Sequence, residues 1–248
     1  MPRFFIEKDS VLEKNGQKEI VIRGEDAHHI SRSLRMAEGE KIEVCDMQKT
    51  VYLCELIGFS EKEVFAKVIE QSEATSEPKY KIRLFQALPK SDKMETIIQK
   101  TTECGVSEII PFRSERCVVR LDSKDAERKR ERWQKIAESG AKQSGRGIIP
   151  QICSVMNFEE AIASACQSSI TIFCNEREKE ITLKRVLNES KIDNDIAIII
   201  GSEGGFSERE AEYISKQGAY SVTLGNRILR CETAPTFVLS CIAYHTEM

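Results

Sequence analysis

IAIIIGSEGGFSEREAEYISKQGAYSVTLGNRILRCETA, residues 196–234, contains two consecutive units in which a strand is followed by a polar, glycine-bearing loop and a helix. The first loop follows the apolar run 196–200 and precedes a helix. The spacing of Ser207 and Glu210, three residues apart as in a capping box, marks the start of that helix. In open α/β sheets, ligands bind at the C-terminal ends of the strands. The segment therefore predicts an α/β fold with a ligand site at these loops.

The sequence on either side of a polar stretch at 71–79, QSEATSEPK, differs in its periodicity. Before it, short alternating segments predict a small, mostly β domain with one helical stretch: strands at 19–22, 41–45, 51–57 and 64–69, and the helix at 25–34. After it, strands alternate with helices, which predicts a parallel sheet: strands at 82–88, 107–112, 148–153, 169–174, 195–200 and 220–224, and helices that include 92–104 and 233–245. We expect domains at 1–72 and 73–248, joined by the polar linker.

The composition argues against a membrane-spanning protein, a disulfide-linked protein and a metal-binding protein. The 248 residues are 40% hydrophobic, enough for a core, and no apolar run is long enough to span a membrane, so we expect a cytoplasmic protein with no membrane partner. Nine cysteines without a CxxC pair and only three histidines predict reduced thiols and no metal site. The net charge of −3 hides a basic middle third, +6 over 76–150, which suggests a polyanion surface or simply a solvated helix face at 127–135.

The two loops of residues 196–234 constrain the ligand. GSEGGF has neither of the usual phosphate-binding spacings, and a carboxylate at Glu203 disfavours a phosphate, whereas the sulfonium of S-adenosylmethionine satisfies this electrostatic restriction. In the second loop Gly225 permits close backbone approach, and Arg230 and Glu232 offer opposite charges. A tight turn with a surface ion pair is the alternative interpretation of that second loop.

Ordered motifs along nearly the whole chain resemble the RsmE family of 16S ribosomal RNA (uracil-N3)-methyltransferases, within the SPOUT superfamily. The motifs are RFF at 3–5, HHxxxxLR at 28–35, LPKxDKME at 88–95, KTTECGV at 100–106, PFRSERCV at 111–118, QSGR at 143–146, GSEGGFSERE at 201–210 and LGNRILRCETA at 224–234. The chain departs from the family pattern at Ser202, where proline is usual, at Cys104, where leucine is usual, and at Lys142, where glutamate is common. None of these changes removes an obvious catalytic group.

The resemblance implies a PUA-like β-barrel that helps to dock RNA, and a trefoil-knotted α/β domain that binds S-adenosylmethionine and forms a homodimer. The reaction would be methylation of uracil N3 in small-subunit ribosomal RNA, either free or in the assembled subunit. By analogy, three loops would hold the cofactor. Their residues are Cys174, Asn175, Glu176, Ile200, Gly201, Gly204, Gly205, Leu224, Gly225, Asn226, Ile228, Leu229 and Thr233.

Methyl transfer to a neutral uracil requires alignment and removal of the N3 proton. We expect Glu203 or Glu232 to accept that proton and Arg230 to stabilise charge on the uracil carbonyls. The alternatives are an ion pair or a helix N-terminal charge for Glu203, and a carboxylate in the first turn of a helix for Glu232. Basic residues of the matched motifs are the candidates for RNA contact: Arg3, His28, Arg32, Arg35, Lys90, Lys93, Arg113 and Arg116. A nicotinamide-dependent oxidoreductase and a non-catalytic RNA-binding factor are the alternative functions.

Overall fold

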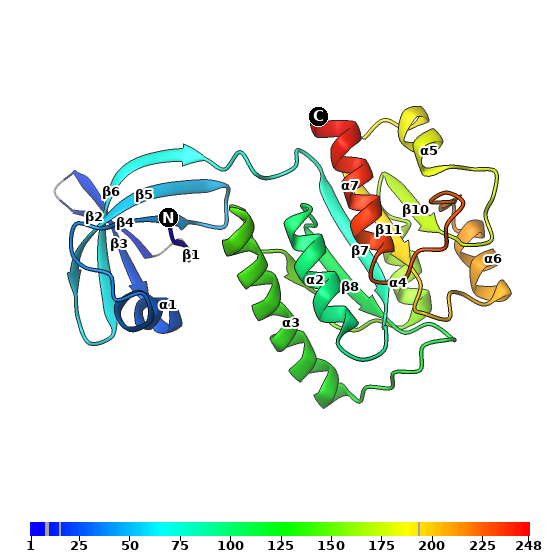
Figure 1. The fold of residues 1–248 in the computed structure, drawn as a ribbon, viewed down its shortest axis with the longest axis horizontal. Coiled ribbons are helices and arrows are strands. Elements are labelled where there is room, and N and C mark those ends of the chain that lie inside the picture. Colours follow the sequence, from blue (N-terminus) through cyan, green and yellow to red (C-terminus); the bar gives the residue numbers. More distant parts are fainter. Residues whose placement is uncertain (8–9, 15, 193) are drawn as a thin grey trace. The chain divides into compact units, whose positions relative to one another are not determined.

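The computed structural model describes residues 1–7, 10–14, 16–192 and 194–248, which form two compact units. The first unit is Met1–Glu77 together with Ala141–Ile149, and the second is Pro78–Gly140 together with Pro150–Met248 (Figure 1). The long helix α3, Ser123–Ser144, therefore begins in the second unit and contributes its last residues to the first.

A six-stranded sheet in the order β1-β4-β5-β6-β3-β2 forms the first unit. Its strands are antiparallel neighbours except for β1, which runs parallel to β4. The apolar positions of the alternating segments form the core, and Ile20, Ile42 and Leu56 are fully buried. The strands are β1 (Arg3–Phe5), β2 (Val11–Lys14), β3 (Gln17–Arg23), β4 (Lys41–Cys45), β5 (Thr50–Phe59) and β6 (Glu63–Glu73).

The helical stretch predicted at 25–34 is present as α1, Gly24–His28, followed directly by a π-helical turn, His29–Ser33. Ala27 and Ile30 face the core, whereas His28, Arg32 and Arg35 are exposed. Arg35 has a φ of 52°, so the basic end of this segment leaves the helix through a left-handed residue.

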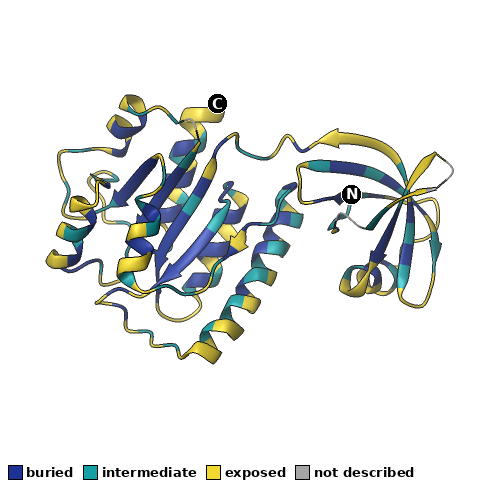
Figure 2. Cartoon of the chain, turned by 180° about the vertical axis from the view of Figure 1, so that it is seen from behind, coloured by how far each residue is buried: buried dark blue, intermediate teal, exposed yellow. Residues whose placement is uncertain are grey.

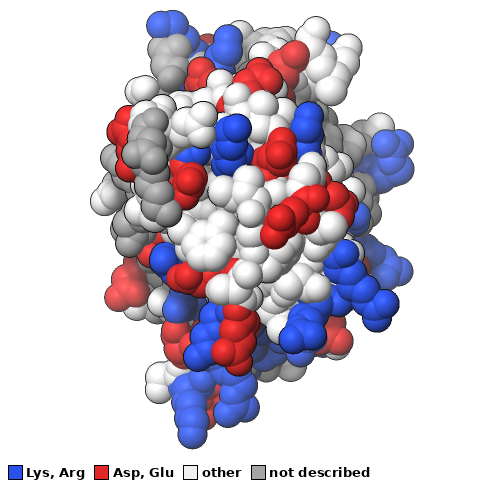
Figure 3. Space-filling model, turned by 90° about the vertical axis from the view of Figure 1, so that its left-hand side faces the viewer, with Lys and Arg blue, Asp and Glu red and all other residues white. Residues whose placement is uncertain are grey.

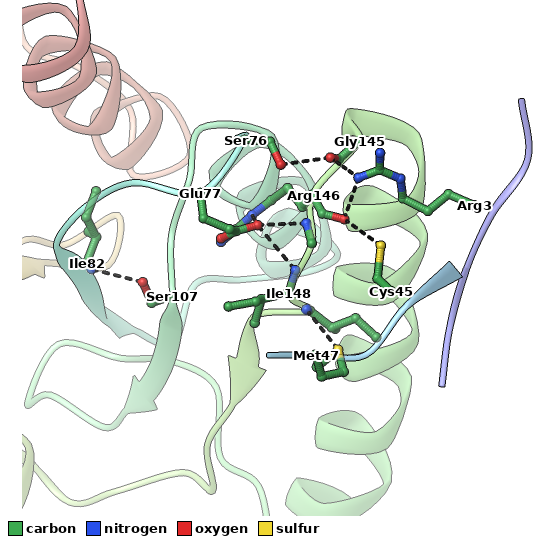
Figure 4. Close-up of polar contacts among 12 residues, drawn as sticks. Arg3, Cys45, Met47, Ser76, Glu77, Ile82, Ser107, Gly145, Arg146 and Ile148 are labelled. Atoms are coloured by element: carbon green, nitrogen blue, oxygen red, sulfur yellow. Dashed lines mark hydrogen bonds and ion pairs between the residues drawn. The ribbon is translucent and has the colours of Figure 1, made fainter. Parts of the chain in front are cut away.

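Residues 141–149 attach to the first unit through a buried ion pair (Figure 4). Arg146 Nη2 lies 2.6 Å from Glu77 Oε2, and the two side chains are only 3% and 5% exposed. Glu77 Oε1 also accepts hydrogen bonds from the backbone N–H groups of Gly147 and Ile148, at 2.9 and 3.2 Å. Arg3 donates to the carbonyl oxygens of Gly145 and Arg146. The QSGR motif therefore holds this segment to the first unit.

The linker prediction is wrong at its start, because residues 71–73 continue strand β6 and pair with β5. Their side chains are polar and exposed, so they lack the apolar alternation that marks a strand. The strand predicted at 148–153 is reduced to β9, Gln151–Ile152, because residues up to Ile149 belong to the first unit.

The second unit is built on a sheet in the order β12-β10-β11-β7-β8-β9, in which every neighbouring pair is parallel. Its central strands are buried and helices cover it, with their outer sides exposed (Figure 2). The strands are β7 (Lys81–Ala87), β8 (Glu108–Phe112), β10 (Ile170–Cys174), β11 (Asp195–Ile200) and β12 (Tyr220–Val222). The helices are α2 (Lys93–Glu103), α4 (Phe158–Ala165), α5 (Leu183–Glu189), α6 (Glu208–Lys216) and α7 (Ala234–Glu247). The predicted parallel α/β sheet is confirmed.

Within the described part of the chain, no helix combines the length and the apolar character needed to cross a membrane.

Candidate active site

Four neighbouring parallel strands, β12, β10, β11 and β7, end at one edge of the second unit's sheet. Because the strands are parallel, the loops that follow them lie together at that edge. The loops after β10, β11 and β12 enclose most of a cavity of about 760 Å³. The sequence segment 196–234 therefore contributes two of the three loops that line the cavity, as its strand-to-loop pattern predicts.

The structure brings most of the predicted cofactor residues to this cavity. Eleven of the thirteen line it: Cys174, Asn175, Glu176, Ile200, Gly201, Gly205, Leu224, Gly225, Asn226, Ile228 and Leu229. Gly204 and Thr233 are not among the described residues that line it. Glu203 and Arg230 also line the cavity, and Glu232 lies beside it through its contact with Lys93.

Glycines in the loop after β11 are needed because neighbouring groups come very close. Gly205 has a φ of +61°, and a Cβ there would lie 3.0 Å from Oε1 of Glu176. A Cβ on Gly204 would lie 3.0 Å from the Cβ of Arg116, whose guanidinium donates to the carbonyl oxygen of Gly204 at 3.0 Å. Below the loop, the buried ring of Phe206 packs edge-on against Phe173 at 5.3 Å. The loop is thus fixed from both sides.

The helix that follows this loop, α6, is capped by its own side chains. The predicted capping box is confirmed: Ser207 Oγ accepts from the backbone N–H of Glu210, and Glu210 Oε2 accepts from the N–H of Ser207 at 2.9 Å. Glu210 Oε1 also accepts from the backbone N–H of Glu115 at 2.7 Å. A carboxylate therefore already occupies the helix N-terminus, which is where a phosphate would otherwise bind.

A lysine links two carboxylates at the edge of the cavity, and we call Lys93, Glu203 and Glu232 the carboxylate clasp. Lys93 Nζ lies 2.9 Å from Glu203 Oε1 and 3.5 Å from Glu232 Oε2. Glu203 also accepts from the backbone N–H of Lys90, at 3.1 and 3.3 Å, and Glu232 accepts from the thiol of Cys231 at 3.2 Å. Lys93 therefore compensates the charge of Glu203, so repulsion by a bare carboxylate is not what excludes phosphate here.

The clasp keeps its three groups charged near neutral pH. Burial alone would raise the pKa of Glu203, but the hydrogen bond from Lys93 and backbone donors hold that pKa below its ordinary value. The pKa of Glu232 is lowered in the same way, against burial, by its bonds to Cys231, the backbone and Lys93. The hydrogen bond to Glu203 raises the pKa of Lys93, and burial raises the pKa of the Cys231 thiol to about 12.

Arg230, the third predicted catalytic residue, differs from the clasp in its exposure. Its side chain is 82% exposed, and its Nη1 lies 4.0 Å from Glu232 Oε1. An exposed guanidinium held this loosely is free to move toward a bound substrate. The catalytic roles of Arg230, Glu203 and Glu232 stay predictions.

Sequence reasoning missed some residues of the cavity. Arg177, Glu178, Lys179 and Thr182, from the loop after β10, line it, and so does Lys93, which was assigned to RNA contact. The polar run from Asn175 to Lys179 directly follows an apolar strand, and this pattern could have indicated that the loop after β10 lines the cavity. The position of Lys93 had no local signal, because its partners lie more than a hundred residues away in the sequence.

The residues predicted to contact RNA fall in both units. In the first, His28, Arg32 and Arg35 are exposed, whereas the side chain of Arg3 is 13% exposed and pairs with Glu43 at 2.8 Å. The remaining four, all in the second unit, are Lys90, Lys93, Arg113 and Arg116, of which Lys93 and Arg116 have the partners given above and Arg113 donates to the carbonyl oxygen of Leu121. Figure 3 shows basic and acidic side chains interspersed over one face, with Lys and Arg gathered toward its lower right.

Known proteins match this chain over both units. The RNA methyltransferase domain family matches residues 75–243, and the RNA methyltransferase PUA domain family matches residues 22–69. The predicted PUA-like first domain is thereby confirmed, whereas the knot stays a prediction.

Named relatives agree with these matches. The chain is 38% identical to ribosomal RNA small subunit methyltransferase E of Bacillus subtilis (strain 168), over 100% of this chain and 98% of the other. It is also 38% identical to the enzyme of that name from Mesomycoplasma hyopneumoniae (strain 232), over 80% and 84%. The crystal structure of a ribosomal RNA small subunit methyltransferase E from Neisseria gonorrhoeae, bound to S-adenosyl methionine, superposes with a TM-score of 0.84 at 27% identity over 98% and 97%. The chain therefore belongs to the RsmE family, the ribosomal RNA small subunit methyltransferases E.

Proposed function

We propose that this chain transfers the methyl group of S-adenosylmethionine to N3 of a uridine in small-subunit ribosomal RNA. The observation that carries the proposal is the cavity at the ends of β10, β11 and β12, in a chain whose relatives are methyltransferases of that RNA and include a structure with the cofactor bound. The choice of uracil N3 as the acceptor rests on the family resemblance.

The residues of the cavity fit S-adenosylmethionine. Ile200, Leu224 and Leu229 provide apolar surface for an adenine ring, and Gly205 and Gly225, which have no side chain, let a ligand approach the backbone closely. Both carboxylates and cations line the cavity, as a ligand with an amino group, a carboxylate and a sulfonium requires. The N-terminus of α6, already capped by its own carboxylate, is closed to a phosphate-bearing cofactor.

When bound, S-adenosylmethionine supplies a methyl group that its sulfonium charge has already activated. The residues of this chain must then orient the uracil and accept the N3 proton as the new carbon–nitrogen bond forms. Glu232 and Glu203 are ionised and can act as hydrogen-bond acceptors, while Arg230 is placed to move onto a uracil carbonyl oxygen that gains negative charge. Because both carboxylates are weak bases, alignment contributes more than proton removal.

We assign RNA docking to the first domain, residues 1–72, and to the basic motif residues of the second. The exposed Arg32 and Arg35 at the end of the first unit's helical segment support this assignment. The uridine must be unpaired before its N3 edge is accessible, so contacts to the surrounding phosphates have to hold the RNA while the base enters the cavity. A bacterial ribosomal substrate also implies a cytoplasmic location.

A homodimer is part of the proposal. Phe237 and Tyr244 are exposed on α7, at 37% and 74%, and their spacing of seven residues places them on one face of the helix. This apolar face is available to a second copy of the chain. Sedimentation velocity of the full chain tests it, because Phe237→Glu with Tyr244→Glu should give a monomer, and an unchanged dimer would exclude this face.

Calorimetric titration with S-adenosylmethionine, with NAD as the control, tests the cofactor, and mass spectrometry of nucleosides from treated small subunits tests the reaction. Saturable binding of S-adenosylmethionine alone and the appearance of N3-methyluridine are expected. Binding without transfer to any ribosomal substrate would favour a non-catalytic RNA-binding factor, and NAD binding would favour the oxidoreductase. In the Arg230→Ala variant, turnover should fall far more than cofactor affinity; equal losses would discard its catalytic role.

RNA docking is tested by removing two charges at once. Arg32→Ala with Arg35→Ala should weaken RNA binding and reduce the slope of log affinity against log salt by about 2, since each lost phosphate contact removes about one unit. The matched control is Lys41→Ala with Lys67→Ala, which removes the same charge from exposed strand positions of the same unit. Equal effects of the two pairs would mean that only net charge matters.

A further inference from the structure

Lys93 is the first residue of α2, at the edge of the sheet where the cavity lies, and it lines that cavity. Its two carboxylate partners come from different walls. Glu203 belongs to the loop after β11, and Glu232 to the turn that precedes α7. One ammonium group therefore connects the start of a helix with two loops that are distant in the sequence.

Both carboxylates depend on that ammonium group for a countercharge. The side chains of Glu203 and Glu232 are 26% and 20% exposed, so water screens their charges only in part. Among the described residues, Lys93 is the cation within 4.0 Å of both. Arg230 reaches Glu232 alone, at 4.0 Å, from an exposed position. Without Lys93, two like charges would face each other across the cavity edge.

We propose, on the basis of the methyltransferase function above, that Lys93 is a positioning residue: it holds the loop after β11 and the turn before α7 in the arrangement that binds the cofactor. The contacts with Glu203 and Glu232 use the ammonium group that a phosphate of RNA would need. The role differs from the RNA contact predicted from the sequence, because its direct effect is on the shape of the cavity. It differs from catalysis because Lys93 acts through the two carboxylates.

Replacement of Lys93 by methionine should make cofactor binding depend on pH. Within the described part of the chain, the charged and titratable groups that face this position are Glu203, Glu232, the thiol of Cys231 and the guanidinium of Arg230, and the backbone N–H of Lys90 donates to Glu203. In the Lys93→Met variant the two carboxylates repel each other at pH 8, and protonation of one of them at lower pH removes the repulsion. Affinity for S-adenosylmethionine should fall about tenfold at pH 8, equivalent to one pKa unit of interaction, and recover toward the wild type near pH 5.5.

The experiment is calorimetric titration of the full chain with S-adenosylmethionine at pH 5.5 and pH 8. Lys93→Arg should retain binding at both pH values, and the double variant Lys93→Met with Glu232→Gln should recover it at pH 8, because one charge of the repelling pair is gone. The matched control is Lys100→Met, which removes the same charge from the same helix but breaks a local pair with Glu103, 3.0 Å away. Lys100→Met should bind as the wild type does.

Hydrogen exchange of the ligand-free chain gives a second readout. Peptides that cover 201–207 and 229–233 should exchange faster in Lys93→Met than in Lys100→Met, whether or not the wild type binds the cofactor. A wild type that does not bind S-adenosylmethionine would count against the proposed function but not against the positioning role of Lys93. Unchanged exchange with unchanged affinity would overturn the proposal, and a loss confined to RNA affinity would make Lys93 an RNA contact. Weak binding at both pH values without rescue by Glu232→Gln would mean that the ammonium contacts the ligand directly.

Discussion

Glu77→Gln removes the charge of the buried carboxylate that holds residues 141–149 to the first unit while keeping its shape. Arg146 is 3% exposed and would lose its bidentate partner, whose oxygens now lie 2.6 and 3.2 Å from the guanidinium nitrogens. Breaking a buried ion pair by removing one partner typically costs about 3–5 kcal/mol, because the remaining charge stays buried. The amide oxygen of glutamine still accepts from Gly147 and Ile148, so the substitution isolates the charge.

Glu77→Ala should cost more than Glu77→Gln. It also leaves the buried N–H groups of Gly147 and Ile148 without their acceptor, at about 1–3 kcal/mol each when left unpaired. The increments share one network and will not add fully. Since a typical domain is stable by about 5–15 kcal/mol, the alanine variant should lose most of the attachment of this segment.

Hydrogen exchange measured by mass spectrometry follows the segment directly. In Glu77→Gln, protection of peptides within 141–149 should fall by about two to four powers of ten, which is about 3–5 kcal/mol at 1.36 kcal/mol per power. The chain's single tryptophan, Trp133, lies in the second unit, so its fluorescence midpoint in urea should stay unchanged. The matched control is Glu63→Gln, which breaks the exposed Arg23 pair in the same unit and should cost at most about 1 kcal/mol. Equal protection in Glu77→Gln and Glu63→Gln would refute the role of the buried pair.

Gly147→Ala should lower the free energy of unfolding of the first unit by about 1–3 kcal/mol, because its Cβ would lie 2.4 Å from the Cβ of Ala74. In urea unfolding, adding Ala74→Gly should restore that free energy. The control Gly58→Ala should cost little, because the nearest atom to its Cβ would be 3.8 Å away. Ser202→Ala should raise the free energy of unfolding by about 1 kcal/mol, because the Ser202 hydroxyl is buried and has no hydrogen-bond partner among the described residues. Ser207→Ala should lower it by about 1 kcal/mol, because the α6 cap is lost. A loss of stability in both variants would show that the Ser202 hydroxyl has a partner. In the carboxylate clasp the two carboxyl pKa values are lowered and the ammonium pKa is raised. Its contribution to stability should therefore be complete between about pH 4.5 and 10.5. The contribution should be lost as pH falls through the lowered carboxyl pKa values, and also as pH rises through the raised ammonium pKa. The pH dependence of the thermal midpoint in wild type and Lys93→Met checks this, and parallel profiles would contradict it.

Local patterns predicted the elements of the second unit well. The spacing of Ser207 and Glu210 located the start of α6 because a capping box is formed by residues three apart. The buried run 196–200 predicted β11 because a central parallel strand is apolar on both faces. Most of the cavity followed from the same logic, since parallel strands put their loops at one edge.

Two strands of the first unit, β1 and β2, were not predicted. They are only three and four residues long, too short for a periodic signal to emerge from Arg3–Phe5 or Val11–Lys14. The end of β6 was assigned to a linker because its polar, exposed residues carry no apolar alternation, although their backbone pairs with β5. Backbone pairing is independent of side-chain polarity, so composition is a weak guide at such strand ends.

The cationic partners of Glu77 and Glu203 could not be predicted from the sequence either. Each lies in a polar stretch that reads as a loop, and in each case the structure supplies a cation from a distant segment: Arg146 for the first and Lys93 for the second. The consequences differ with burial. Glu77 is nearly inaccessible, so its pair fixes the attachment of a segment, whereas Glu203 stands partly exposed at a cavity, so its pair can shape a binding site and respond to pH. A carboxylate in such a polar stretch therefore does not reveal its role by its sequence alone. The cation that pairs with it and its exposure to water determine whether its charge stabilises the fold or shapes a ligand site.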